Sequence, residues 1–389
     1  MSPVWSLALI CLVVGVLSGP DAHADETGRL SEADTKQLGW NPEALDRALD
    51  YAKSLSTDTL MIVTDGVVVR SFGDLHRPRM THSMRKALLS ALVGQHAGPG
   101  PKQLDLDATL KELGIDDEPG PLSPLQSQAK VLHLIKNTSG INHAAAAEAG
   151  LTQEKDRRLG DGENAPGTVW AYNNWDHNVL TSVFESATGL SVGEAFKSGI
   201  ADRIGMQDFS TASVSYVSEP QVSQHRAAMF EMSARDLASF GQLYLSKGNW
   251  RGDQVIPGSW VERIVSDQTP TGDPGLKSGH GYLWWIPGPE TGLPRGTYFA
   301  WGLGQQALFV LPEWRTVVVH QADMQEFLER LLEITKEEQI DTATALERLA
   351  LHCLEISHAG SDFCRDDRFI LRREFDRLIS LIVQARNPP

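Results

Sequence analysis

Strand-like segments lie near both ends of this 389-residue chain, and a long helical stretch separates them. Residues 59–63 and 67–72 are rich in β-branched residues and flank Asp65-Gly66, which is a strong signal for a β-hairpin. Further strand-like runs occur at 281–286, 297–301, 307–312 and 316–320. The pattern predicts an α/β (α+β) fold: an antiparallel sheet flanked by helices and built from both ends of the chain, with an all-helical lobe at about residues 87–205 inserted in it.

The N-terminal segment has the features of an export signal. Val4 to Leu17 is apolar and too short for a comfortable membrane span, and Ala22-His23-Ala24 supplies the small residues that a signal peptidase recognises. We therefore expect cleavage after Ala24 and a periplasmic or secreted protein. The segment before the apolar run lacks Lys and Arg, so an uncleaved anchor is the alternative. The formal net charge of −15 argues against a nucleic-acid partner.

A candidate nucleophile stands at the start of a predicted buried helix. Ser83-Met84-Arg85-Lys86 runs directly into the apolar segment 87–93. Residues three apart share a helix face, so the Ser83 hydroxyl and the Lys86 amine can point into one pocket. A desolvated lysine with a lowered pKa can take the proton of the hydroxyl. This S-x-x-K pattern occurs in serine β-lactamases and penicillin-binding proteins.

Two other serines compete with Ser83 for this role. Ser127-Gln128-Ala129-Lys130 has the same spacing, but no apolar helix follows it directly. Ser191 lies in a G-x-S-x-G sequence, which in α/β-hydrolases follows a strand. Here a predicted helix precedes it, and Ser191 with Glu194 instead matches a helix capping box. We therefore favour Ser83.

Acyl transfer by Ser83 and Lys86 also needs a group that passes a proton to the leaving group and a site for the oxyanion. Tyr172 is a candidate for the first, and the segment of Gly302 and Gly304 is a candidate for the second. In Tyr172-Asn173-Asn174, a phenol whose pKa is lowered by a lysine could accept the serine proton and return it to a leaving group. Alone, this sequence is more typical of an aromatic loop packed under the surface. Gly302-Leu303-Gly304 enters a strand, where it permits close backbone approach for an oxyanion donor or simply marks a bulge.

Together these motifs resemble those of the serine β-lactamase-like and penicillin-binding-protein superfamily. The most similar branch contains class C β-lactamases, esterases, D,D-peptidases and 6-aminohexanoate-dimer hydrolase-like proteins. The similarity covers roughly residues 40–323. Five further segments carry it: Ala91-Leu92-Val93-Gly94, Thr138-Ser139-Gly140-Ile141, Trp175-Asp176, Met232-Ser233-Ala234-Arg235-Asp236-Leu237 and Gly281-Tyr282-Leu283-Trp284-Trp285.

The resemblance implies a serine hydrolase that cleaves an amide or ester through an acyl-enzyme. Ser83 would be acylated, Lys86 would be its proton partner, and Tyr172 would be the general base and acid. Asn174 would orient either Lys86 or the substrate. The oxyanion would be held by the backbone N–H groups of Ser83 and of a residue at the start of the last site strand, for which we favour Gln306. No cofactor is implied, and the scattered histidines indicate no metal site.

One departure from the pattern bears on the substrate. Relatives usually carry Lys, His or Asn where Leu303 stands, and Gly where Gln305 stands. Leu303 cannot bind a substrate carboxylate, which favours a neutral amide or ester over penicillins or D-Ala-D-Ala peptides. Two alternatives stay open: a β-lactamase or D,D-peptidase proper, and a catalytically weak binding protein of the same fold.

The resemblance divides the chain into a signal peptide (1–24), a β-lactamase-like serine hydrolase domain (25–323) and a C-terminal helical extension (324–389). Three roles are open for the extension: packing on the sheet, capping the site, or self-association. Cys353 and Cys364 lie in it, and they either pair in an oxidising compartment or remain separate structural cysteines.

Overall fold

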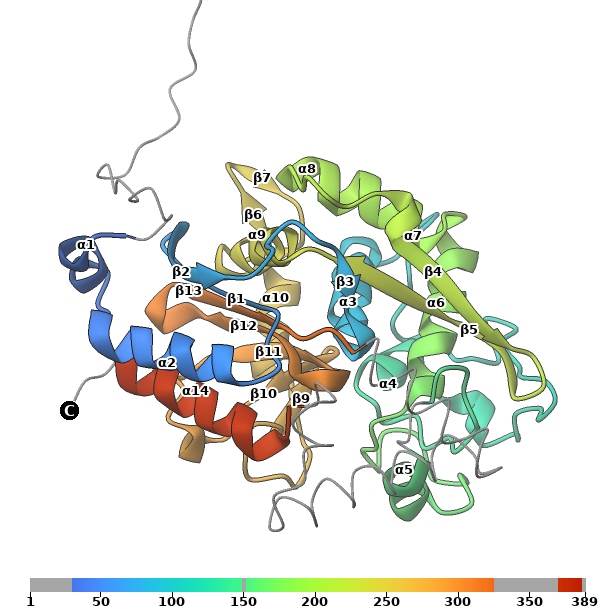
Figure 1. The fold of residues 1–389 in the computed structure, drawn as a ribbon. Helices are drawn as coiled ribbons and strands as arrows, with labels where there is room; N and C mark the ends of the chain where they lie inside the picture. The colour runs from blue at the N-terminus through green and yellow to red at the C-terminus, as the bar shows by residue number, and fades with distance from the viewer. Residues whose placement is uncertain (1–29, 149–151, 325–369, 387–389) are drawn as a thin grey trace, which may run out of the picture.

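The protein is described by a computed structural model for residues 30–148, 152–324 and 370–386. Its centre is an eight-stranded antiparallel sheet with the strand order β2-β1-β13-β12-β11-β10-β9-β8 (Figure 1). The strands are β1 (Thr59–Thr64), β2 (Val67–Phe72), β8 (Thr269–Pro270), β9 (Gly279–Gly281), β10 (Trp284–Ile286), β11 (Tyr298–Gly302), β12 (Gln306–Leu311) and β13 (Thr316–Gln321). The predicted sheet built from both ends of the chain is confirmed.

The two halves of the sheet join at β1 and β13. These strands pair antiparallel over their whole length, with Met61 opposite Val319. The predicted hairpin β1–β2 forms around Asp65 and Gly66, which adopt φ angles of 53° and 78°. Such left-handed conformations suit Asp-Gly and match the twist of the flanking strands. A turn that the sequence itself favours therefore sets the register of this edge.

One predicted strand, at 281–286, is instead a hairpin. Tyr282 and Leu283 have φ angles of 50° and 70° and form the turn between β9 and β10. Both side chains are buried, so packing compensates for a backbone conformation that non-glycine residues rarely adopt.

Two helices cover one face of the sheet. Helix α2 (Pro42–Ser54) lies beside α14 (Arg372–Arg386), the last helix of the chain (Figure 1). Asn41 caps α2 by accepting a hydrogen bond from Ala44 N at 2.8 Å, as its Asn-Pro start predicts. The apolar side of α14 is buried in the same cluster as Phe309 of β12. Residues 370–386 therefore show one of the three roles considered for the C-terminal extension, packing on the sheet.

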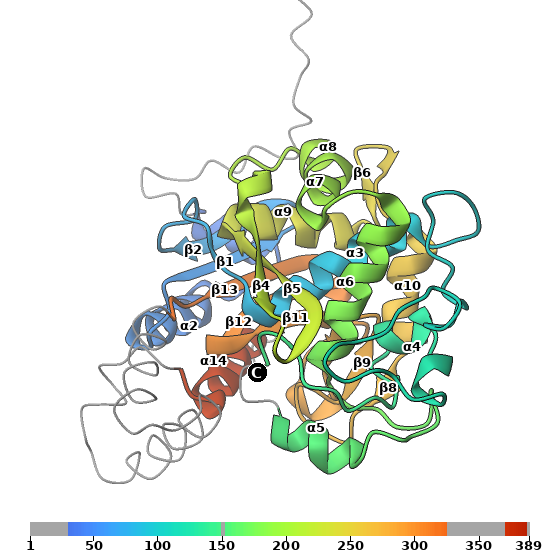
Figure 2. The ribbon, with the colours of Figure 1, turned by 90° about the vertical axis from the view of Figure 1, so that its right-hand side faces the viewer.

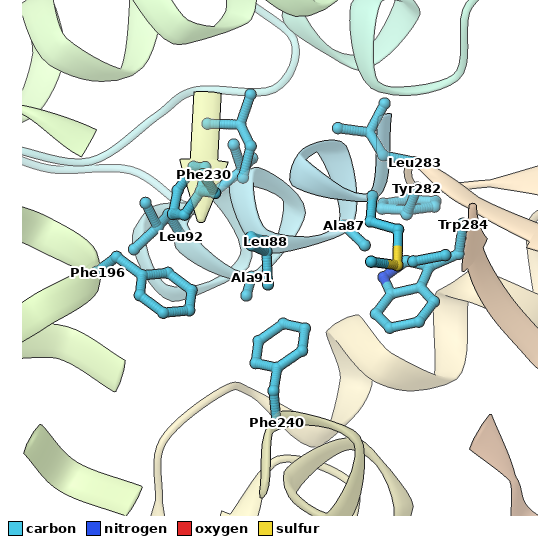
Figure 3. Close-up of a cluster of buried hydrophobic side chains, with 14 of the residues drawn as sticks. Ala87, Leu88, Ala91, Leu92, Phe196, Phe230, Phe240, Tyr282, Leu283 and Trp284 are labelled. Atoms are coloured by element: carbon cyan, nitrogen blue, oxygen red, sulfur yellow. The ribbon is translucent and has the colours of Figure 1, made fainter. Parts of the chain in front are cut away.

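Helices α3 (Arg85–His96), α9 (Ala234–Leu245) and α10 (Gly258–Ser266) contribute to the core on the other face. Helix α3 runs through the middle of this core and is buried on nearly every side. Its apolar residues meet aromatic side chains from several other elements (Figure 3), among them Phe196, Phe230, Phe240 and Trp284. A helix that is apolar all round can only be stable in such a place.

The inserted lobe contains helices joined by long loops. They are α4 (Val131–Ile135), α5 (Thr152–Leu159), α6 (Asn174–Thr188), α7 (Val192–Phe196) and α8 (Asp202–Ile204). A small antiparallel sheet of β3 (Arg79–Met80), β5 (Ser223–Met232) and β4 (Val214–Glu219) borders them, and β5 packs against α6 (Figure 2). These three strands lie outside the predicted all-helical lobe of about residues 87–205 and were not predicted from the sequence. Buried and exposed side chains alternate along much of β5, as expected for a strand that packs against the lobe on one side.

Several predictions fall on other parts of the chain. The signal peptide at 1–24, Cys353 and Cys364 lie outside the described residues, and most of 324–389 does too. None of the helices within 30–148, 152–324 or 370–386 is long and apolar enough to cross a membrane.

Candidate active site

Ser83 and Lys86 meet at the start of the central helix. Ser83 lies in a short 3-10 turn (His82–Met84) that continues into α3, and Lys86 Nζ lies 2.8 Å from Ser83 Oγ. Lys86 is only 3% exposed. His82, immediately before the serine, has a φ of 47°, a conformation that is costly for a non-glycine residue and is frequent at active sites. The S-x-x-K spacing thus produces the contact that it predicts.

The surroundings of Lys86 favour its neutral form. Burial lowers the pKa of Lys86 well below its usual value, and the positive charges of Arg85 and Lys277 lower it further. The carboxylate of Glu148 opposes this shift. Because a neutral amine can accept a proton, Lys86 is suited to take the proton from the Ser83 hydroxyl.

Tyr172 lies beside this pair within an aromatic cluster. Lys86 Nζ lies 4.6 Å from the centroid of the Tyr172 ring, and the ring stacks on Trp285 at 5.3 Å. Burial raises the pKa of Tyr172 to about 12, while a hydrogen bond with Ser83 and the charge of Arg85 oppose this rise. The expected lowering of the phenol pKa is therefore not what this environment produces. The phenol keeps its proton at neutral pH and can donate it.

Asn174 is hydrogen-bonded to the backbone of a neighbouring loop. Its Nδ2 donates to the carbonyl oxygens of Ala147 and Glu148, at 3.2 Å in each case. The side chain thus fixes the loop that carries Glu148 and makes no hydrogen bond to Lys86. Its Oδ1 is buried and has no hydrogen-bond partner among the described residues, so the other expected role, orienting the substrate, stays a prediction. Glu148 in turn pairs with Lys155 at 3.3 Å. Asn174 therefore acts on Lys86 only through the position of this carboxylate.

A buried polar network anchors the Tyr172 segment to the lobe. Asp176 accepts hydrogen bonds from Ser139 Oγ at 2.6 Å and from Asn173 Nδ2 at 3.2 Å. Asn173 also caps α6 by accepting a hydrogen bond from Trp175 N at 3.1 Å. Two of the motifs that carry the family resemblance thus meet at Asp176, and together they fix the start of α6 next to Tyr172.

The hairpin between β11 and β12 closes the site on the side of the sheet. A Cβ atom on Gly302 would lie 2.4 Å from the Thr81 carbonyl oxygen, so only glycine permits this approach to the Ser83 turn. Gln306, the expected oxyanion donor, lies on β12, and its side chain donates to Ala322 O. It is absent from the cavity lining, whereas residues 302–305 all contribute to it. Gln305 turns its amide away to donate to Ile370 O at 3.0 Å.

A cavity of about 390 Å³ opens onto Ser83. Its walls are aromatic and charged, and Tyr172 and Leu303 line it as well. The remaining lining side chains are Glu154, Arg158, Trp170, Thr271, Asp273, Lys277, Trp285, Trp301, Gln305 and Arg372. In the described residues, no group of three or more His, Cys, Asp or Glu side chains could hold a metal ion.

Several residues of this site were not predicted from the sequence. Arg85 is buried inside the S-x-x-K motif itself, where it donates to Asn178 Oδ1 at 3.3 Å. Lys277 and Arg372 come from segments that carry no recognisable motif. His280 of β9 packs against Tyr172 at 6.1 Å, and burial lowers its pKa to about 3, so it is neutral. Only Arg85 had a signal in the sequence, as a charged residue at the start of an apolar helix.

The two competing serines have ordinary structural roles. Ser127 Oγ donates to Pro124 O at 3.0 Å, and Lys130 pairs with Asp107 at 2.9 Å. Ser191 and Glu194 form the expected capping box at the start of α7. Neither serine lines the cavity that contains Ser83.

Comparisons with known proteins agree with this geometry. A putative 6-aminohexanoate-dimer hydrolase from Bacillus anthracis has a similar structure, with a TM-score of 0.52, 22% identity and coverage of 77% of this chain and 82% of that one. An uncharacterised protein of Alkalihalophilus pseudofirmus is 24% identical over 61% of this chain and 71% of its own length. A D-aminopeptidase of Gluconobacter oxydans is 27% identical over 33% of this chain and 25% of its own length. A family model described as Beta-lactamase matches residues 47–323.

Proposed function

This chain belongs to the beta-lactamase family of serine hydrolases, and from that premise we propose that it cleaves an amide or ester through an acyl-enzyme on Ser83. The observation that carries the proposal is the buried contact of 2.8 Å between Ser83 Oγ and Lys86 Nζ. A buried lysine next to a serine hydroxyl, with a cavity opening onto the serine, suits nucleophilic catalysis.

The acylation step uses three side chains. Ser83 Oγ attacks the carbonyl carbon of the substrate while its proton passes to the neutral Lys86 amine. Backbone N–H groups stabilise the oxyanion: that of Ser83 and that of a residue at the start of β12, for which Gln306 remains our candidate. Tyr172 gives its proton to the departing amine or alcohol, and the Lys86 ammonium then returns a proton to the phenol.

Deacylation reverses this route with water as the nucleophile. Lys86 takes a proton from the attacking water, and Ser83 regains its proton as the acyl group leaves as a carboxylic acid. Two relatives are named as a D-aminopeptidase and a putative 6-aminohexanoate-dimer hydrolase, and both names describe enzymes that act on amides, which supports an amide substrate here. We further propose that the mature protein acts outside the cytoplasm, on the basis of the apolar N-terminal segment and Ala22-His23-Ala24.

Labelling of the folded protein tests this proposal. The mature chain is treated with a fluorophosphonate probe and its intact mass is measured, beside Ser83→Ala and the matched control Ser127→Ala. We expect one adduct on the wild type and on Ser127→Ala, and none on Ser83→Ala. A folded wild-type protein that gains no adduct would overturn the proposal and favour the catalytically weak binding protein.

A further inference from the structure

Lys277 occupies an unusual position in the cavity wall. Its Nζ lies 4.1 Å from the ring centroid of Trp301 and 5.1 Å from that of Trp285, so two indole faces flank the ammonium group. Cation–π contacts of this kind hold a cation in place without neutralising it. Trp285 in turn stacks on Tyr172 at 5.3 Å. Lys277 is therefore separated from the reactive groups by a single aromatic ring.

The acidic side chains around Lys277 are engaged elsewhere. Asp273 accepts a hydrogen bond from Gly275 N at 2.6 Å, and Glu154 accepts one from Arg158 at 2.8 Å. Asp376 pairs with Arg372 at 2.8 Å. Across the described part of the chain, no carboxylate lies within ion-pair distance of Lys277 Nζ. A cation at a cavity wall with no anionic partner of its own is available to an anionic ligand.

Two arginines also lie in this wall, and each is paired with a carboxylate, Arg158 with Glu154 and Arg372 with Asp376. Arg372 lies over the Trp301 ring at 4.4 Å, and Arg158 lies over Trp170 at 4.9 Å. Both line the cavity with Lys277. Arg372 belongs to the C-terminal segment, beyond the residues that the family model matches. That segment is held in place by Gln305, which donates to Ile370 O at 3.0 Å.

We propose that Lys277, supported by Arg372, binds a carboxylate of the substrate, and that the protein acts on amides or esters carrying this group next to a flat or apolar portion. The proposal rests on the hydrolase function proposed above and names its substrate class. The indole faces of Trp170, Trp285 and Trp301 would contact the apolar portion. The cation that Leu303 cannot provide thus comes from a different loop, so the expectation of a neutral substrate does not follow from Leu303 alone.

A binding experiment on Ser83→Ala tests the subsite separately from catalysis. Two ligands of nearly equal shape, 4-phenylbutanoate and 4-phenylbutanamide, are titrated by calorimetry and by the fluorescence of the cavity tryptophans. We expect the carboxylate to bind at least about tenfold more tightly than the amide, the size of effect expected for a charge-assisted hydrogen bond. Adding Lys277→Met should abolish this preference, whereas adding Lys277→Arg should retain part of it.

The control is Lys247→Met, because Lys247 is exposed and pairs with Glu262 outside the cavity. It should leave the preference unchanged. Equal binding of the two ligands, or a preference that survives Lys277→Met, would overturn the subsite while leaving the hydrolase proposal intact. Conversely, failure of the fluorophosphonate probe to label Ser83 would overturn the hydrolase and leave the binding result standing.

The pH dependence of binding gives a second readout. Burial lowers the pKa of Lys277 to about 8, Arg372 lowers it as well, and Asp273, Glu154 and Asp376 oppose this. Lys277 is a cation below this pKa and loses its charge as the pH rises through it. The preference for the carboxylate should therefore decline between about pH 7 and 9, and Lys277→Arg should remove the decline because arginine stays charged. A preference that is constant over this range in the wild type would count against Lys277 as the binding group.

Discussion

The chain contains two S-x-x-K sequences, and the fold places them in opposite environments. Ser83 and Lys86 lie at the start of the central helix with their polar atoms 2.8 Å apart, and Lys86 is 3% exposed. Ser127 and Lys130 lie at the surface of the lobe, where the Lys130 side chain is 40% exposed and pairs with Asp107. Ser127 directs its hydroxyl to a backbone carbonyl of its own turn.

The difference between these two sites shows what the motif itself does and does not supply. Spacing alone allows a hydroxyl and an amine to share one side of a helical turn, but the 3-10 turn that contains Ser127 ends before Lys130, whose backbone is extended. A lowered lysine pKa, however, needs burial and neighbouring positive charge, and only Lys86 has both. Substitutions at the two serines, the two lysines and Tyr172 test this difference.

The largest effect is expected from the two serines. Ser83→Ala should lower the turnover of an activated ester by at least about 10³-fold, because it removes the hydroxyl that contacts the buried Lys86 amine. Ser127→Ala should leave turnover within about twofold of the wild type. Steady-state hydrolysis of p-nitrophenyl esters by the two variants measures both values. Equal losses in both variants would contradict the assignment.

The two lysines should differ almost as strongly. Lys86→Met should lower kcat/KM by about 10²- to 10⁴-fold, the range for removal of a general base. Lys130→Met should have no measurable effect on hydrolysis. The rate of fluorophosphonate labelling, followed by mass spectrometry, gives the same comparison without a substrate. An unchanged labelling rate in Lys86→Met would show that another group activates Ser83.

Tyr172 gives a third test of the difference between the two sites, because its ring lies against Lys86 at 4.6 Å. Tyr172→Phe should lower turnover of an amide, whose leaving amine needs a proton, by about 10²-fold. The loss should be smaller for a p-nitrophenyl ester, since nitrophenolate leaves without a proton. A loss of the same size for both substrates would indicate that Tyr172 positions the substrate and does not deliver a proton.

The smallest expected effect concerns the free energy of unfolding. Lys86→Met should increase it, although the same substitution lowers activity. The folded-state pKa of Lys86 is lowered relative to the unfolded chain, so unfolding takes up a proton at pH values between the two, and wild-type stability rises with pH there. Lys86→Met removes this cost and should stabilise the protein by about 1 kcal/mol or more, with a larger gain at lower pH. Lys130→Met should change stability by less than about 1 kcal/mol. Urea denaturation at several pH values measures both, and a destabilised Lys86→Met would contradict the burial argument.

Local patterns accounted for most of the fold. The Asp65-Gly66 hairpin, the Asn41 cap of α2, the Ser191 capping box and the apolar helix after Ser83 all form as their sequences predict. Each depends on contacts between residues a few positions apart, which spacing reveals. The turn at Tyr282-Leu283 was missed because its residues favour a strand and only tertiary packing compensates for the positive φ angles.

The sequence predicted which residues meet at the site, but it did not predict the pKa of Tyr172 or the contacts of Asn174. Ser83, Lys86 and Tyr172 meet as expected, yet burial raises the phenol pKa instead of lowering it. Asn174 holds the loop at Ala147 and Glu148 instead of contacting Lys86. Such outcomes depend on how deeply a group is buried and on what faces it from distant segments, and neither is encoded in the motif.

The sequence alone indicated the sheet built from both ends of the chain, the candidate nucleophile Ser83 with Lys86, and the serine hydrolase family. The structure was needed to show which form of each ionisable group is favoured, where the chain turns at Tyr282-Leu283, and which segments complete the cavity. Lys277 and Arg372 reach the cavity from segments about 190 and 290 residues beyond Ser83. The physical reason is that propensity and spacing act over a few residues, whereas desolvation and electrostatic interaction depend on distances in space.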